Sequence, residues 1–214
     1  MVMDKPAASK ESAVPPISAH NNTTHGSITL VRHGEPALSR KILFNAKGYG
    51  DWWAIYEVGG IKDPQSPPPA VAARVQSADI LLVSTRRRAH ESMQLLAAGR
   101  EYAEHEVFIE APLPPPPFPG WIHFSPRIWG FVTRFWWWFF NHHKDGESRA
   151  QAHLRSDDAA RILIDRANGG KSVVLVAHGF FNVMIEKSLI SMGWHRTWHE
   201  GGFRYWSTRH FEKL

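Results

Sequence analysis

The sequence predicts an α/β fold with a mainly parallel central sheet and helices on both faces, in three layers. Short runs of β-branched and apolar residues alternate with longer segments whose apolar residues recur at helical spacing. Strands that alternate with helices form largely parallel sheets, which are covered on both sides. The length of 214 residues and the hydrophobic content of 43% are sufficient for one such domain.

The expected strands are short and mostly apolar. They lie at residues 27–32 (SITLVR), 78–84 (ADILLVS), 106–110 (EVFIE) and 172–177 (SVVLVA). The expected helices follow them, at residues 87–98, at residues 148–167, and in the apolar-periodic segment after Gly179.

The remaining segments predict the domain organisation. Residues 1–26 are rich in Pro, Ser, Asn and Thr and are expected to form a disordered tail. Residues 27–214 are then one catalytic domain. Residues 40–77 and 112–147 do not follow the strand–helix rhythm and are rich in Trp, Pro and Gly, so we expect them to form substrate walls, with an aromatic-rich cap insertion at about 112–147.

Composition excludes several classes of protein. The chain has no cysteine, hence neither disulfides nor a thiol nucleophile, and no carboxylate cluster in it looks suited to an essential metal. The net charge of +5 suits an anionic ligand, but the basic residues are too scattered for nucleic acid. With neither a secretory h-region nor 18 consecutive apolar residues, a cytoplasmic location is expected.

Reactive side chains follow the predicted strands. Arg32 and His33 follow the first strand, Arg88 lies just past the second, Glu110 ends the third and His178 follows the fourth. Arginine matches phosphate oxygens with two donors, and a neutral imidazole can attack phosphorus. A carboxyl group can protonate a departing alkoxide. Together these side chains form a complete set for phosphoryl transfer without a metal or other cofactor.

Two of these strand ends carry recognisable motifs. The segments LVRHGE and VLVAHG resemble the two signature motifs of the histidine phosphatase superfamily, also called phosphoglycerate-mutase-like. The segment SADILLVSTRRRAHESMQLL resembles the Arg-Ala element of that family, FIEAPLP its acidic proton-donor stretch, and GESRAQAHLR its Gly-Glu-Ser helix start. The likeness extends from about Ser27 to Trp206.

The resemblance implies a function and a role for each candidate residue. His33 would become a phosphohistidine, and Glu110 would protonate the leaving group and then activate water. Arg32, Arg88 and His178 would bind the phosphoryl oxygens. The expected activity is metal-independent hydrolysis of a phosphomonoester. The alternatives are a phosphoglycerate-mutase-type phosphotransferase and an inactive relative that binds a phosphorylated ligand. The acid has three rivals: Glu91, Glu104 and Glu106.

The aromatic segment RFWWWFFNHHK leaves two interpretations open. If residues 128–140 are helical, the helix is apolar nearly all round, and at roughly 20 Å it is too short to cross a bilayer of about 30 Å. It could cap a pocket for a phosphorylated small-molecule or lipid-like substrate. It could also make peripheral membrane contact through Trp136, Trp137 and Trp138, because tryptophan favours the interface. Neither interpretation fixes an oligomeric state.

Overall fold

The computed structural model describes residues 26–144 and 146–213, so the predicted tail lies almost entirely outside the described residues. The described chain has the expected α/β architecture. The sheet contains six strands in the order β3-β2-β4-β1-β6-β5. They are β1 (Ser27–Arg32), β2 (Ile80–Ser84), β3 (Ala103–His105), β4 (Ser172–Ala177), β5 (His195–Glu200) and β6 (Thr208–Glu212).

The strand register places successive side chains on opposite faces of the sheet. β1 pairs in parallel with β4, and β4 and β3 pair in parallel with β2. Ile28 and Leu30 of β1 belong to one apolar core, whereas Val31 belongs to another. Each central strand is therefore buried on both faces, as its continuous apolar sequence predicted.

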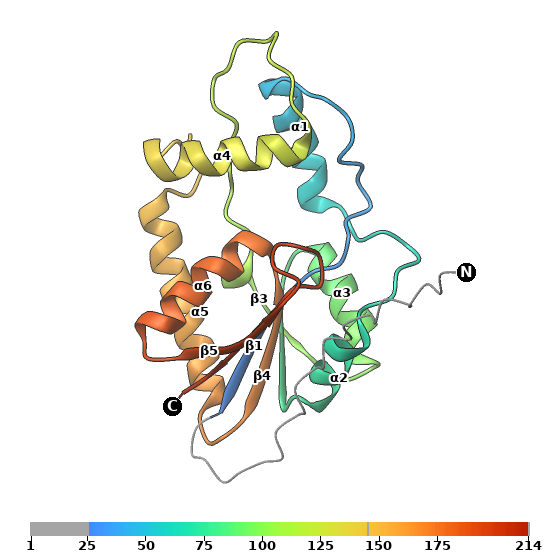
Figure 1. Cartoon of the computed structure of the whole chain (residues 1–214), viewed down its shortest axis with the longest axis vertical. Coiled ribbons are helices and arrows are strands. Elements are labelled where there is room, and N and C mark those ends of the chain that lie inside the picture. The colour runs from blue at the N-terminus through green and yellow to red at the C-terminus, as the bar shows by residue number, and fades with distance from the viewer. Residues whose placement is uncertain (1–25, 145, 214) are drawn as a thin grey trace, which may run out of the picture.

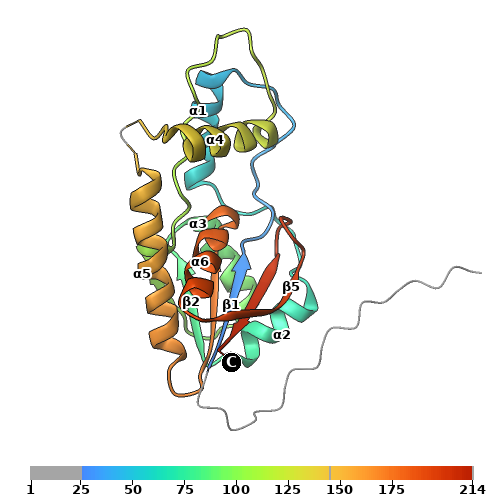
Figure 2. The same ribbon diagram turned by 60° about the vertical axis from the view of Figure 1, so that its left-hand side comes forward.

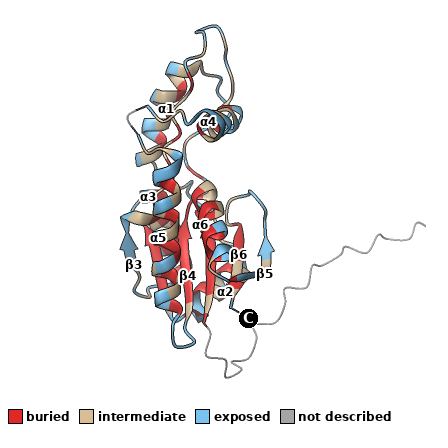
Figure 3. Ribbon diagram, turned by 90° about the vertical axis from the view of Figure 1, so that its left-hand side faces the viewer, coloured by how far each residue is buried: buried red, intermediate tan, exposed pale blue. Residues whose placement is uncertain are grey.

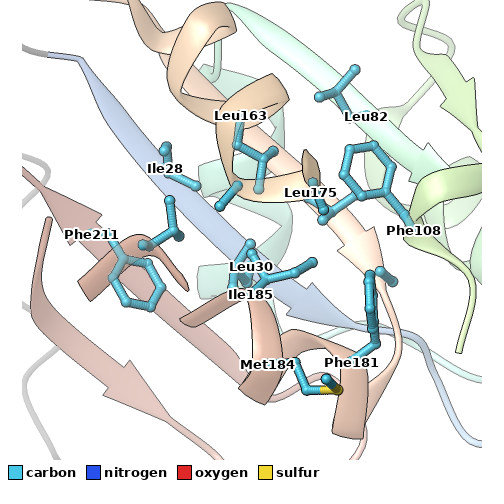
Figure 4. Packing of buried hydrophobic residues seen from close by; sticks show 14 of the residues in the cluster. Ile28, Leu30, Leu82, Phe108, Leu163, Leu175, Phe181, Met184, Ile185 and Phe211 are labelled. Carbon is cyan, nitrogen blue, oxygen red and sulfur yellow. The ribbon is translucent and has the colours of Figure 1, made fainter. Parts of the chain in front are cut away.

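Helices cover both faces of this sheet. On one face, α2 (Pro69–Ser77) and α3 (Arg87–Ala97) pack against the core that contains Val31. On the other, α5 (Arg149–Ala167) and α6 (Gly179–Ser191) pack through Leu163 and Ile185 onto Ile28 and Leu30 (Figure 4). The three predicted layers are confirmed.

A second lobe lies beyond the carboxyl ends of β1 and β4. It contains α1 (Ala46–Val58) and α4 (Pro126–Phe140), which Figures 1 and 2 show above the sheet. The Tyr49 and Trp129 rings stack at 5.5 Å between centroids, and the Trp129 indole N–H donates to the carbonyl of Phe44 at 2.7 Å. This aromatic cluster, rather than the sheet, holds the two helices together. We refer to α1, α4 and their connecting loops as the cap lobe.

The predicted strand at residues 106–110 is wrong. Strand β3 ends at His105, and a 3₁₀ turn, η1 (Glu106–Phe108), follows it. The His105 side chain accepts the backbone N–H of Val107 and so caps this turn. The Arg155 guanidinium takes the carbonyls of Val107 and Ile109, both at 2.8 Å. Carbonyls bound to an arginine are not free to pair with a neighbouring strand.

Two further details differ from the expectations, and a third agrees with them. The sequence analysis missed β5 and β6, an antiparallel pair at one edge of the sheet. Within residues 40–77, α2 is an ordinary layer helix, because Val71 and Val75 pack against the sheet core. The expectation that residues 128–140 are helical is confirmed by α4.

The packing of α4 corrects the assignment of its tryptophans. Trp137 is fully buried and its indole N–H donates to the carbonyl of Glu147 at 3.1 Å, so it cannot contact a membrane. Trp136 and Trp138 are half-buried. Among the described residues, no helix combines the length and apolarity that crossing a bilayer requires.

Candidate active site

Strand register brings the two candidate histidines together. Arg32 pairs with Ala177 at the carboxyl ends of β1 and β4. The residue that follows each strand is a histidine, so both histidines lie at the same end of the sheet. The rings of His33 and His178 lie 5.3 Å apart between centroids, and both are buried. Two motifs separated by 145 positions in sequence, His33 to His178, therefore form one site.

His33 is held as a neutral imidazole with one free nitrogen. Its Nδ1 lies 2.7 Å from the carbonyl of Gly34, and because a carbonyl only accepts, Nδ1 carries the proton and donates. Burial, with the positive charges of Arg88 and Arg32, lowers the pKa of His33 well below its ordinary value of 6.5. The Nε2 lone pair is therefore available for nucleophilic attack.

His178 is also neutral, and one of its nitrogens has no partner. Burial, the charge of Arg88 and the neighbouring His33 lower its pKa well below 6.5. Its Nε2 lies 2.8 Å from the Ser84 hydroxyl, which accepts the backbone N–H of Arg86 and can donate its own proton to Nε2. This arrangement leaves the ring proton on Nδ1, which is buried without a hydrogen-bond partner among the described residues.

Arg88 is a buried arginine fixed from the cap lobe. Its guanidinium forms a 2.9 Å ion pair with Glu57 and donates to the carbonyls of Tyr56 and Glu57 at 3.1 and 3.2 Å. Its Nε remains buried and unpartnered in the described structure. The backbone carbonyl of Arg88 also accepts the Ser92 hydroxyl, which in turn accepts the N–H of Gly34 at 2.8 Å. Helix α3 is thereby connected directly to the first motif.

Arg32 fits beside the second motif because residue 179 is glycine. A Cβ built on Gly179 would lie 2.9 Å from the Arg32 Nε, closer than a side chain normally tolerates. The guanidinium donates to the Phe203 carbonyl and lies 4.6 Å from the centroid of the Tyr205 ring. Its Nε, like that of Arg88, is buried without a partner among the described residues.

Glu110 lies against the first turn of α6, although no strand places it there. One carboxylate oxygen accepts the backbone N–H of Phe181 at 2.9 Å, in the first turn of α6, which begins directly after His178. The carboxyl group is buried, and its charge acts on Arg32. The start of α6 therefore brings the Glu110 carboxyl group close in the fold to the second histidine.

The three rival acids are engaged or exposed. Glu91 accepts the N–H of Ile61 at 2.7 Å and pairs with Arg87. Glu104 is exposed and lies 2.7 Å from His90, and Glu106 is exposed. In the described structure these carboxylates form no hydrogen bond or ion pair with the two histidines or the two arginines of the site, so Glu110 remains the candidate.

Residues Glu147 and Arg155 position the loop that carries Glu110. Arg155 of α5 makes two hydrogen bonds of 2.7 and 2.6 Å to the Glu147 carboxylate. The same guanidinium holds the carbonyls of Val107 and Ile109 and lies 3.9 Å from the centroid of the Phe181 ring. This clamp fixes the chain immediately before Glu110 against the first turn of α6.

Sequence analysis missed two residues, one in the loop before α1 and one within α1. Arg40 donates to the Tyr205 hydroxyl at 2.7 Å, and its charge contributes to the lowered pKa of His33. Glu57, which pairs with Arg88, was also missed. Such residues have no local signal, because only the folded cap lobe brings them to the strand ends.

The described residues contain no obvious metal site, and a cavity that they form lies away from the candidate residues. No group of three or more His, Cys, Asp or Glu side chains in this part of the chain could hold a metal ion. A separate cavity of about 380 Å³ lies between α6 and the β5–β6 pair and is lined by Glu186, Arg196 and Phe203 among others. It does not include any of the five candidate residues.

The fold and the site together define a class of α/β protein. In this class, two neutral histidines and two arginines lie beyond the carboxyl ends of the central parallel strands. Residues 68–205 match the family model of the histidine phosphatase superfamily (branch 1). This range is more than half of the chain, and the chain therefore belongs to that superfamily. The match includes Arg88, Glu110 and His178, whereas the motif with His33 precedes it. No protein of curated function matches the chain significantly.

Solved structures of this fold are similar to the chain at low sequence identity. A mycobacterial glucosyl-3-phosphoglycerate phosphatase, solved with VO₃, has a TM-score of 0.50 and 19% identity over 78% of this chain and 81% of its own. An Entamoeba histolytica phosphoserine phosphatase, solved with 3-phosphoglyceric acid, has a TM-score of 0.50 and 16% identity over 78% and 80%. These similarities confirm the fold.

Proposed function

We propose that the protein is a phosphomonoester hydrolase that works through a phosphohistidine on His33. The observation that carries this proposal is a set of buried N–H donors without partners around a neutral imidazole. Within the described residues, Arg32 Nε, Arg88 Nε and His178 Nδ1 are all buried and unpaired. Unpaired buried donors cost free energy, and a phosphoryl group supplies the acceptors that would satisfy them.

The first step transfers the phosphoryl group to the enzyme. The Nε2 lone pair of His33 attacks phosphorus, and the bond from phosphorus to the ester oxygen breaks. The departing alkoxide takes a proton from Glu110. Arg32 and Arg88 neutralise the charge that develops on the phosphoryl oxygens, and His178 donates through Nδ1. In this proposal the arginines supply the positive charge that a metal ion would otherwise provide.

The second step returns the free enzyme. Glu110, now a carboxylate, takes a proton from water, and the hydroxide attacks phosphorus. The bond between phosphorus and His33 Nε2 breaks, which releases inorganic phosphate and restores the neutral imidazole. The hydrogen bond from Nδ1 to Gly34 keeps the same tautomer throughout, so the nucleophile needs no rearrangement between turnovers.

The substrate is proposed to be a phosphorylated small or lipid-like molecule. The related structures are named for phosphoserine and glucosyl-3-phosphoglycerate. In this chain Arg40 gives the site a third cation near His33, which suits a substrate with a second anionic group. The buried Tyr56 ring of the cap lobe lies 4.6 Å from the Arg88 guanidinium.

Trapping the intermediate tests the mechanism. Rapid acid-free quenching after mixing with an aryl phosphate should yield an acid-labile phosphoryl adduct that maps to His33. The His33→Ala variant should form no adduct and should lose hydrolysis while keeping its circular dichroism spectrum. Vanadate should inhibit the parent, and chelators should not. Full activity in His33→Ala, or activity lost on chelation and restored by a divalent ion, would overturn the proposal.

A further inference from the structure

The outer face of α4 presents apolar side chains that the folded chain leaves uncovered. Trp129, Thr133 and Trp137 are buried on the inner face. Residues two positions away lie about 200° around a helix axis, so Phe131 and Phe135 point away from this packing. Ile128, Phe131, Phe135 and Phe139 are exposed and form what we call the outer stripe of α4.

The outer stripe is a continuous apolar surface. The Phe135 and Phe139 rings lie 4.7 Å apart between centroids, and the exposed Phe140 ring lies 6.3 Å from Phe135. Phe131 is 71% exposed and Phe139 66% exposed, which is unusual for side chains of this size on a stable helix. Figure 3 shows exposed parts of α4 on the cap lobe, in pale blue, beside buried and half-buried parts.

Exposed cations lie beside this stripe. Arg149 donates to the backbone carbonyl of Trp138 at 2.7 Å, and the Lys187 ammonium lies 4.7 Å from the centroid of the Trp138 ring. Both side chains are exposed, as is Arg127 at the other end of α4. The sequence has no acidic residue between Glu110 and Asp145. The half-buried Trp138 thus separates an apolar stripe from a basic edge.

We propose that the outer stripe of α4 docks on the surface of a lipid bilayer that contains anionic headgroups. A short helix with apolar aromatic residues on one side and cations at its edge is suited to lie in the interfacial plane. At about 22 Å the helix is too short to span a bilayer, but its length suits this orientation. Arg149 and Lys187 would meet the headgroup phosphates, and Trp138 would lie at the headgroup level.

The basic edge argues against a second copy of the chain as the occupant. In a two-fold symmetric dimer the same surface faces itself, so the cations Arg127, Arg149 and Lys187 of both copies would gather in one interface. Like charges placed together across an interface are unfavourable. An anionic bilayer complements both the apolar stripe and its charge.

Vesicle flotation with the full chain tests this proposal. The parent should float with vesicles of phosphatidylcholine mixed with phosphatidylglycerol, and less with phosphatidylcholine alone. Replacing Phe131, Phe135 and Phe139 together with Ser should lower partitioning by roughly tenfold or more. The matched control replaces three exposed apolar residues elsewhere (Leu95, Leu154 and Ile190) with Ser, and it should float like the parent.

A charge variant keeps the test independent of any folding defect in the triple variant. The double variant Arg149→Gln and Lys187→Gln should lose the preference for anionic vesicles while keeping the stripe intact. Added salt should likewise reduce the preference of the parent protein for anionic vesicles. The proposal is overturned if the parent ignores both vesicle types or if the triple serine variant floats like the parent. It is also overturned if ultracentrifugation shows a dimer that the triple variant dissociates.

Discussion

His33 and His178 link the chemistry of the site to the stability of the fold. Both are buried and neutral, because burial and the adjacent arginines lower the pKa of each well below 6.5. On unfolding each regains its ordinary pKa, and the unfolded chain then binds more protons than the native state below about pH 6.5. Their contribution to stability is therefore complete above that pH and is lost as the pH falls toward the lowered values.

The predicted pH dependence can be measured by denaturant unfolding. Between about pH 6.5 and 5, each of these two histidines should lower the free energy of unfolding by up to about 1.4 kcal/mol per pH unit. A variant with both histidines replaced by Asn should show a correspondingly smaller slope. An equal slope in parent and variant would mean that other groups take up the protons.

Glu110 should reveal its role through the leaving group. Glu110→Gln should slow hydrolysis of an alkyl phosphate by roughly 10²–10⁴, because an alkoxide departs poorly without a proton. Hydrolysis of a nitrophenyl phosphate should change far less, since nitrophenolate needs no proton. If kcat falls equally for both substrates, Glu110 is not the acid.

At the scale of single residues, sequence reasoning was strongest where a residue directly follows a buried strand. Gly34 shows why the first motif needs a glycine at this position. Gly34 has the Trp206 ring and the Gln65 side chain within 2.6 Å of where a Cβ would be. The supporting residues Glu57 and Arg40 could not be predicted in this way, because their positions depend on the cap lobe.

At the scale of elements, α5 both covers the sheet and controls the loop before Glu110. Arg155→Met should leave the Glu147 carboxylate and two carbonyls without their donor, which costs about 2–3 kcal/mol of stability after allowing for its partial exposure. It should also lower kcat with the leaving-group dependence of Glu110→Gln, since it moves the same carboxyl group.

A neighbouring arginine on α5 provides the control for this prediction. Arg161 pairs only with Asp158 in the described structure, and both side chains are more than half exposed. Arg161→Met should cost less than about 1 kcal/mol and leave kcat unchanged. Chemical denaturation measures the change in stability. Steady-state kinetics with the alkyl phosphate and the nitrophenyl phosphate measure the change in kcat. A change of similar size in both variants would remove the assigned positioning role from Arg155.

Elements were predictable where burial imposed a pattern on the sequence. β1, β2 and β4 are buried on both faces and were recognised from apolar runs. The residues of β5 (HRTWHE) are almost all exposed, so they have neither an apolar run nor an alternation to indicate a strand. The strand predicted at residues 106–110 does not form, because the Arg155 side chain binds the carbonyls of Val107 and Ile109.

At the scale of the whole molecule, the cap lobe and the sheet share a few specific contacts. Trp137 of α4 belongs to the sheet core, and Glu57 of α1 reaches Arg88 of α3. The sequence indicated an insertion at 112–147, but α1 joins it through aromatic contacts between distant segments, which no local pattern reveals. We propose that residues 27–214 form a single catalytic domain that includes this lobe.

An anion bound at the site should therefore stabilise the cap lobe and the sheet together. Inorganic phosphate at about 100 times its Kd should raise the free energy of unfolding by about 2.7 kcal/mol, because it binds the native site alone. The rise should appear equally in fluorescence from the buried Trp52 and Trp129 of the cap lobe and in circular dichroism, which also reports the sheet. Arg88→Ala should lose most of this stabilisation, whereas Arg161→Ala should keep it. If the two probes show separate unfolding transitions, and phosphate stabilises only one of them, the cap lobe folds independently of the site.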